Sequence, residues 1–276
     1  MATTITKAVL TDTYKDDFRD SDAYHKILFN SGRSLQAREL TQIQTILQNQ
    51  IKKFGDHYFR EGAPVKPGGL HINLNYEFIK LNTASNALPA DITTLVGTNF
   101  TGQTSGVIAK VLEVTAASGG DPATLFVIYT STVASGASTA TAIRMNAGED
   151  INNGTVTLTV QTTNTTANPA IGVGTRVSIG EGTYYANGHF IFCTNQSKII
   201  SKYTDNPTTD VGYKIVEEVV TTTDDIDLYD NQGATPNISA PGADRYRIRL
   251  VLAEKSEITS SENFVHVASI ENGEIV

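Results

Sequence analysis

The sequence predicts a mainly β protein with one prominent N-terminal α-helix, in which an antiparallel β-domain carries a small inserted all-β subdomain. One stretch repeats apolar residues at helical spacing, and several later stretches alternate apolar and polar residues as half-buried strands do. The polar composition is rich in Thr, Ser, Asn and Gly, which are typical of strands and turns. We expect an N-terminal arm over residues 1–33, a helix over 34–55, a β-domain formed by 56–90 and 171–276, and the inserted subdomain over 91–170.

The helix is expected from about Leu35 to Phe54. Ser34 is a candidate N-cap, and Gly55 could take the left-handed conformation that ends many helices. The apolar residues that recur at helical spacing are Leu40, Ile43, Ile46, Leu47, Ile51 and Phe54.

The polar face of this helix lacks charge, because every polar residue between Leu40 and Ile51 is uncharged. A helix in water normally carries Glu and Lys, whereas uncharged amides can be buried at lower cost when they are hydrogen-bonded. Two interpretations stay open: the helix lies on a sheet, or it packs against copies of itself or neighbouring subunits. In the second interpretation, the oligomer contact is formed by residues at heptad spacing with one polar core position, namely Leu40, Ile43, Leu47, Gln50 and Phe54.

The strands before and inside the insertion follow from alternation and turn residues. Leu70, Ile72 and Leu74 alternate with polar residues after the turn at 67–69. Within the insertion we expect strands over residues 107–114, 125–129 and 155–160, the last of them after an Asn-Gly turn.

The remaining strands follow the insertion. Residues 183–192 form a predicted hairpin around Asn187-Gly188, which is the signature of a type I′ turn. Residues 211–220 predict a strand pair or one long strand. Residues 245–252 predict a strand with an apolar core side and a second side, expected at a solvated or interface face, formed by Arg245, Arg247 and Arg249.

The composition excludes several classes of partner. The formal net charge is −8 and the chain has no basic run, which argues against a nucleic acid and against an anionic membrane surface. Cys193 is the one cysteine, so no intrachain disulfide can form. The first residues lack the layout of a signal peptide, and no apolar stretch approaches the length of about 20 residues that spans a membrane. We expect synthesis in a cytoplasm.

No arrangement of residues indicates catalysis, a metal or a cofactor. His189 and Cys193 point the same way on one predicted strand, but two ligands do not make a metal site, and Cys193 is expected in the core. The acidic residues 224–230 lack the third ligand and the closing Glu of a calcium loop, so a solvated turn is expected. Asp56 and Glu61 have no evident partner as acid and base.

Two segments carry a resemblance to a known family. Residues 30–47, NSGRSLQARELTQIQTIL, resemble the N-terminal signature of a domain of unknown function in virion structural proteins of tailed phages, especially of the cyanophage type. Residues 24–29 and 54–57 agree with that signature. Residues 230–233 and 240–245 are similar to its second block.

The resemblance covers the chain apart from residues 91–170, which look like an insertion beyond the common pattern. It implies a virion protein of the tail, either a baseplate component or a tail-fibre anchoring module, that oligomerises and docks without catalysis. The implied partners are the chain itself, as a homotrimer, and other baseplate or tail-fibre proteins. Family members usually continue further, so we expect a truncated or short version that carries the anchoring portion.

The residues leave two other functions open. A receptor- or glycan-binding tail-fibre domain needs exposed aromatics over a polar groove, but Trp is absent and the tyrosines are scattered. Residues 91–170 are the most suitable place for such a site. A hydrolase needs a carboxylate pair or a metal set, and a pair contributed by distant strands stays open.

Overall fold

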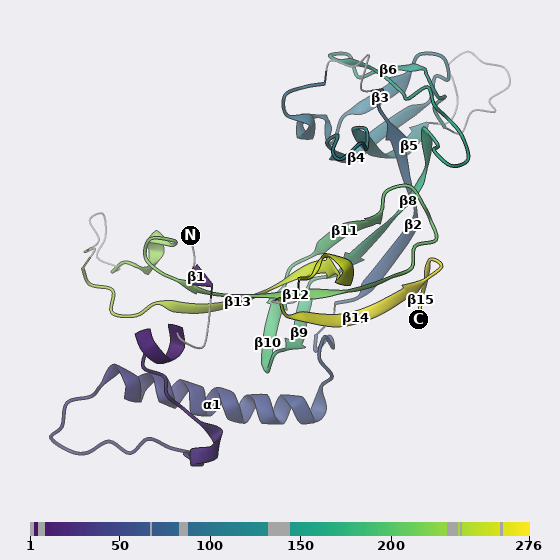
Figure 1. Cartoon of the computed structure of the whole chain (residues 1–276). Helices are drawn as coiled ribbons and strands as arrows, with labels where there is room; N and C mark the ends of the chain where they lie inside the picture. Colours follow the sequence, from purple (N-terminus) through teal and green to yellow (C-terminus); the bar gives the residue numbers. More distant parts are fainter. Residues whose placement is uncertain are drawn as a thin grey trace. The chain divides into compact units, whose positions relative to one another are not determined.

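The computed structural model describes residues 3–4, 9–66, 68–82, 88–131, 144–230, 237, 239–259 and 262–276. The fold is mainly β with antiparallel sheets and one long helix, which confirms the predicted fold class (Figure 1). Residue 67 of the predicted turn and residues 231–233 of the second matching block lie outside the described residues.

The chain forms two compact units, each built from segments far apart in the sequence. The first unit comprises Met1–Leu70, Ile179–Gln196 and Thr209–Ser269. The second comprises His71–Ser178, Ser197–Thr208 and Ile270–Val276. This division differs from the expected boundaries, because the second unit adds flanking strands to the predicted insertion.

In the first unit, helix α1 spans Ala37–Tyr58 and follows an arm with two short helical turns, η1 (Val9–Thr13) and η2 (Asp20–Asp22). The arm runs back along α1 (Figure 1). Gln36, not Ser34, is the N-cap, and its backbone N–H donates to Glu39 Oε2 at 2.9 Å in a capping box. The helix continues through Gly55, so the prediction that Gly55 ends it was wrong.

The first unit is organised around strand β12 (Thr209–Val220), which is one long strand. Strand β13 (Arg245–Glu254) pairs antiparallel with it from Val211↔Glu254 to Val220↔Arg245. Strands β1 (Thr3–Thr4) and β14 (Phe264–Glu271) also pair with β12. The arginine row of β13 is exposed, as expected, and both Arg247 Nε and Arg249 Nε donate to Glu218 Oε1, at 2.7 and 2.9 Å.

The predicted hairpin packs on this sheet. Strands β9 (Gly182–Ala186) and β10 (His189–Cys193) pair antiparallel. Asn187 and Gly188 have φ of 49° and 78°, which confirms the type I′ turn. The shared core includes Tyr184, Ile191, Cys193, Tyr213, Ile215, Leu250 and Leu252, so Cys193 is a core residue as predicted.

The acidic residues after β12 form local turns, as expected for residues 224–230. Asp224 accepts a hydrogen bond from the Thr221 backbone N–H, and Asp225 accepts one from the Asp227 N–H in turn η4 (Ile226–Leu228). Turn η5 (Lys255–Glu257) follows β13.

The second unit is built on an eight-stranded sheet of order β11-β8-β2-β5-β4-β3-β6-β7. Its elements in chain order are β2 (Leu70–Lys80), η3 (Ile92–Leu95), β3 (Asn99–Gly102), β4 (Ile108–Thr115), β5 (Thr124–Ser131), β6 (Asp150–Asn152), β7 (Thr157–Thr159), β8 (Ile171–Ile179) and β11 (Gln196–Ser201). Strand β15 (Glu274–Ile275) pairs with the end of β14.

The strands of the predicted insertion close onto β2. Leu81 pairs with Val160, and the Gln161 N–H donates to the Lys80 carbonyl oxygen at 2.9 Å. The enclosed apolar core therefore extends from Ile79 to Ala170 and includes residues that precede the insertion. This shared core explains why the unit is larger than residues 91–170.

Candidate functional site

The uncharged polar face of α1 holds the arm of the same chain. Carboxylates of the arm accept hydrogen bonds from side chains spaced three and four residues apart on one face of the helix. The bonds run from Gln42 Nε2 to Asp17, from Thr45 Oγ1 to Asp16 at 2.5 Å, from Asn49 Nδ2 to Asp20 at 2.9 Å, and from Lys53 Nζ to Asp20 at 2.7 Å. The Lys53 and Asn49 bonds hold the pKa of Asp20 below its ordinary value.

These contacts correct one interpretation of the sequence. One of the two open interpretations placed other subunits against the amide-bearing face, but Gln42, Thr45 and Asn49 find their partners within the chain.

A second face of α1 lies against the β9–β10 hairpin. The Tyr185 hydroxyl lies 2.6 Å from Asp56 Oδ1 and 3.0 Å from the Lys52 carbonyl oxygen. The Tyr185 ring occupies the space that a Cβ on Gly55 would need, so Gly55 permits this close approach. Burial and the bond to Asp56 raise the pKa of Tyr185, which keeps the phenol protonated as a donor. Gln48 Nε2 adds a bond of 2.9 Å to the Gly188 carbonyl oxygen.

The third face of α1 is exposed and apolar. Its residues are alternately four and three positions apart, and at about 100° per residue they fall in a band of about 80° opposite the arm. We call them the exposed stripe: Leu40, Gln44, Leu47, Ile51, Phe54 and Tyr58. The apolar members are between 44% (Ile51) and 67% (Tyr58) exposed. The Phe54 and Tyr58 ring centroids are 4.7 Å apart.

The predicted oligomer contact overlaps this stripe in part. Leu40, Leu47 and Phe54 lie on it, whereas Ile43 is half-buried and Gln50 is exposed at its border. The exposed stripe therefore contains Gln44 and Ile51 where the predicted contact had Ile43 and Gln50. The sequence showed the heptad spacing but not which of two adjacent seams the arm and the hairpin leave uncovered.

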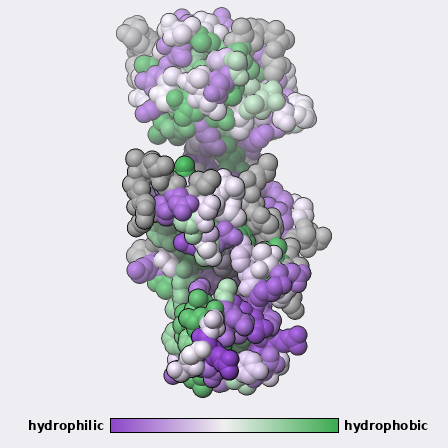
Figure 2. All heavy atoms as spheres, turned by 90° about the vertical axis from the view of Figure 1, so that its left-hand side faces the viewer, coloured by the Kyte–Doolittle hydropathy of each residue, from purple (hydrophilic) through white to green (hydrophobic). Residues whose placement is uncertain are grey.

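The stripe carries no charged residue. The charged residues of α1 are on other faces, where Lys52 Nζ pairs with Asp56 at 3.0 Å and Lys53 pairs with Asp20. Figure 2 shows hydrophobic residues gathered on one side of the part that holds α1 and hydrophilic residues on the other. Exposed apolar residues also precede the helix, namely Tyr24, Leu28, Phe29 and Leu35.

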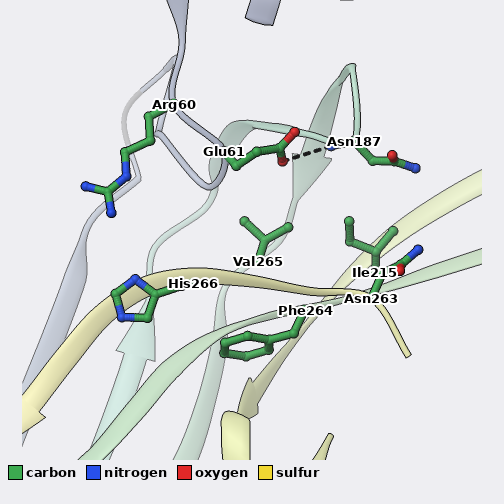
Figure 3. Close-up of a pocket in the computed structure, with 8 residues that line it drawn as sticks. All are labelled: Arg60, Glu61, Asn187, Ile215, Asn263, Phe264, Val265 and His266. Carbon is green, nitrogen blue, oxygen red and sulfur yellow. Dashed lines mark hydrogen bonds between the residues drawn. The ribbon is translucent and has the colours of Figure 1, made fainter. Parts of the chain in front are cut away.

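A groove of about 410 Å³ beside the loop after α1 is a second candidate site. In Figure 3, Arg60 and His266 lie on one side of it and Glu61 points to Asn187, whose backbone N–H donates to Glu61 at 3.0 Å. His266 Nε2 is 3.0 Å from Ser269 Oγ. The groove lining holds no Ser, Cys or Lys nucleophile, and Asp56 and Glu61 bind separate groups of the hairpin rather than each other.

The two candidate metal sites considered from the sequence were His189 with Cys193 and the acidic residues 224–230. Among the residues that the structure describes, no group of three or more His, Cys, Asp or Glu side chains could hold a metal ion. His189 Nδ1 is 2.8 Å from the Asn187 carbonyl oxygen, and Cys193 is buried in the core. No helix in the described part of the chain has the length and apolar character needed to cross a membrane.

The chain matches one family model over residues 12–108 and 129–276, while no curated protein and no solved structure matches it. Residues 91–170 were expected to lie beyond the family pattern, but within that range the match omits only residues 109–128, which belong to β4, β5 and their connection. Most of the predicted insertion is therefore part of the pattern. Because the match covers more than half of the sequence, the chain belongs to the family described as "Domain of unknown function (DUF4815)".

Proposed function

We propose that this protein is a structural component of a tailed-phage tail, a baseplate component or tail-fibre anchoring module that acts by oligomerisation and docking. The observation that carries the proposal is the exposed stripe of α1. Full burial of a large apolar side chain is worth about 1.5–3 kcal/mol, so five such residues on one face favour association strongly. Contiguous apolar surface of this kind is typical of interaction sites.

The attachment of α1 supports a docking role. The arm holds the face opposite the stripe, and the hairpin holds an adjacent face through Tyr185 and Gln48. The stripe is therefore presented on a helix whose orientation within the first unit is set before any partner arrives. Such preorganisation lowers the entropy cost of binding.

The proposal assigns no catalytic role. Two of the polar groups at the groove contact neighbours, Glu61 with Asn187 and His266 with Ser269. General acid–base chemistry needs such groups aimed at a substrate position, with a nucleophile or second acid within reach. The placement in a phage tail rests on the resemblance of residues 30–47 to the tail-protein signature.

Purified particles test the proposal. Mass spectrometry should find the chain in washed particles, and antibody labelling in electron micrographs should place it at the tail. The double variant Leu47→Glu/Ile51→Glu should be lost from particles. The matched control Leu112→Glu/Ile128→Glu, at exposed apolar residues of β4 and β5, should be incorporated. Absence of the unmodified chain from particles would overturn the proposal.

A further inference from the structure

We infer that the free edge of strand β13 pairs with an extended segment of another protein, in which acidic and apolar side chains alternate. The segment adds one strand to the sheet of the first unit beside residues 245–249. This surface differs from the exposed stripe of α1, so the inference goes beyond the proposed function and does not depend on it.

One edge of β13 has no neighbouring strand. In the described part of the chain β13 pairs only with β12, which lies along its other edge. The Gln196 side chain identifies the backbone groups that point away from β12, because it accepts from the Leu252 N–H at 2.8 Å and donates to the Leu250 carbonyl oxygen at 2.7 Å. Alternate residues of an antiparallel strand direct these groups to the same side, so those of Tyr246 and Ile248 lie on this edge too.

Gln196 covers the edge only at Leu250 and Leu252. Among the described residues, the outward backbone groups of Tyr246 and Ile248 have no hydrogen-bond partner. Unpaired groups of this kind are the ones to which an extended segment binds when it adds a strand to a sheet. The uncovered length of about five residues is a usual length for a strand.

The arginines of β13 indicate the charge of the segment. Arg245, Arg247 and Arg249 are all exposed on one face of the strand. Glu218 is their one acidic partner in the described part of the chain, so three positive charges and one negative charge leave an excess of two. Glu218 binds Nε of Arg247 and of Arg249, which leaves their Nη groups for further acceptors. Acidic residues fit this surface best.

The spacing of the arginines indicates where the acidic residues stand. Side chains that are directly opposite on neighbouring strands lie on the same face, at about 5 Å between their Cβ atoms. Acidic residues at every second position therefore face successive arginines. The residues between them face Tyr246, which is 46% exposed, and Ile248, which packs at the border of the core. That side favours apolar residues.

The same arginine row disfavours pairing of β13 with β13 of a second copy. Such pairing places arginines of the two copies next to one another on one face, and like charges on neighbouring strands are destabilising. Charged side chains on an edge strand commonly prevent this kind of self-association. An acidic segment meets attraction at the same positions.

Two peptides that differ only in residue order test the inference on the full chain. Thr-Glu-Val-Glu-Val-Glu-Thr, with blocked ends and a fluorescent label, alternates acidic and apolar residues, whereas Thr-Glu-Glu-Glu-Val-Val-Thr has the same composition and charge. Fluorescence anisotropy should show about tenfold tighter binding of the alternating peptide. Equal affinities would show general attraction between charges and overturn the inference, as would no binding of either peptide.

Substitution of arginines tests the contribution of the charges. Arg247→Gln/Arg249→Gln should weaken binding of the alternating peptide about tenfold, because the charge-assisted hydrogen bonds are lost. Arg33→Gln/Arg60→Gln is the matched control, since it removes two exposed arginines outside β13, and its affinity should not change. An equal loss in both variants would contradict the assigned surface. Circular dichroism checks that the variants are folded.

A proline tests the backbone pairing without a change of charge. Tyr246→Pro removes one outward N–H, and proline is tolerated on an edge strand where this group faces away from the neighbouring strand. Tyr246→Val is the matched control, because it loses the tyrosine side chain and keeps the N–H. The proline variant should bind the alternating peptide several-fold more weakly than the valine variant. Equal affinities would show that the peptide does not pair with the edge.

Light scattering tests whether the occupant is a second copy. Mass measured over a range of concentrations should be the same for the unmodified chain and for Arg247→Gln/Arg249→Gln. Association of the unmodified chain that is lost in this variant would identify the occupant as a second copy and overturn the inference.

Discussion

The phenol oxygen of Tyr185 lies 2.6 Å from Oδ1 of Asp56, although 129 positions separate the two residues in the sequence. This contact joins the hairpin turn to the last turns of α1 and brings the tyrosine ring against Gly55. It leaves the exposed stripe, which lies on an adjacent face of the helix, free. The position of one tyrosine therefore contributes to deciding which face of α1 can meet a partner.

Gly55→Ala should destabilise the protein. An alanine in an exposed helix is favoured over glycine by about 1 kcal/mol, but here the methyl group overlaps the Tyr185 ring and should cost about 1–3 kcal/mol instead. Guanidinium denaturation measures the change. Gly242→Ala is the control, because no atom lies within 4 Å of its Cβ position. A more stable Gly55→Ala protein would contradict the packing described for Tyr185.

Removing the carboxylates of the arm should release it from α1. Asp16→Asn/Asp17→Asn/Asp20→Asn loses the charge-assisted bonds to the helix, so trypsin should cleave the arm at Arg19 and Lys26 several-fold faster. Asp12→Asn/Asp22→Asn removes charge from the same arm but no bond to α1, and its cleavage rate should not change. Equal rates for the two variants would show that the carboxylates do not hold the arm.

Glu149 should be important for the stability of the second unit. It is 5% exposed and accepts hydrogen bonds from the Thr104, Ser105 and Asn146 N–H groups and from Ser105 Oγ. Glu149→Ala leaves these donors without an acceptor and should cost about 3 kcal/mol or more. Glu149→Gln keeps one acceptor oxygen and should lose less. Urea denaturation orders the two variants, and a neutral Glu149→Ala would refute the assignment.

Glu262 should contribute a pH-dependent part of the stability. Its hydrogen bond from Lys214, together with the Thr259 backbone N–H, lowers its pKa from 4.5 to about 2. The folded state therefore binds fewer protons than the unfolded state between these values. The contribution is present above pH 4.5 and is lost as the pH falls to about 2.

Denaturation at a series of pH values between about 6 and 2 measures this dependence. Glu262→Gln should show a shallower fall in stability over the acidic window than the unmodified protein. Glu274→Gln, at an exposed residue near the end of the chain, should not alter the slope. Identical pH profiles for all three proteins would contradict a role for the Lys214–Glu262 pair.

The sequence by itself determined the elements whose signals are local. The Asn187-Gly188 turn, the alternation along β12 and β13, and the apolar period of α1 all depend on residues within a few positions of one another. Local chemistry of this kind acts before the chain folds, so it could be interpreted without knowledge of distant contacts. The spacing of Leu40, Leu47 and Phe54 along one face of the helix could likewise be predicted from the sequence alone.

Only the tertiary structure decided which side of α1 is covered and which is free. The arm carboxylates accept hydrogen bonds from Gln42, Thr45 and Asn49, and Tyr185 of the hairpin packs against Gly55. The face that stays exposed therefore contains Gln44 and Ile51. Pairing of Leu81 with Val160 likewise merged the predicted insertion with β2. The physical reason is the same in all three cases. The residues of a helix face or a strand edge do not specify which segment will cover them, because long-range packing of the chain determines that contact.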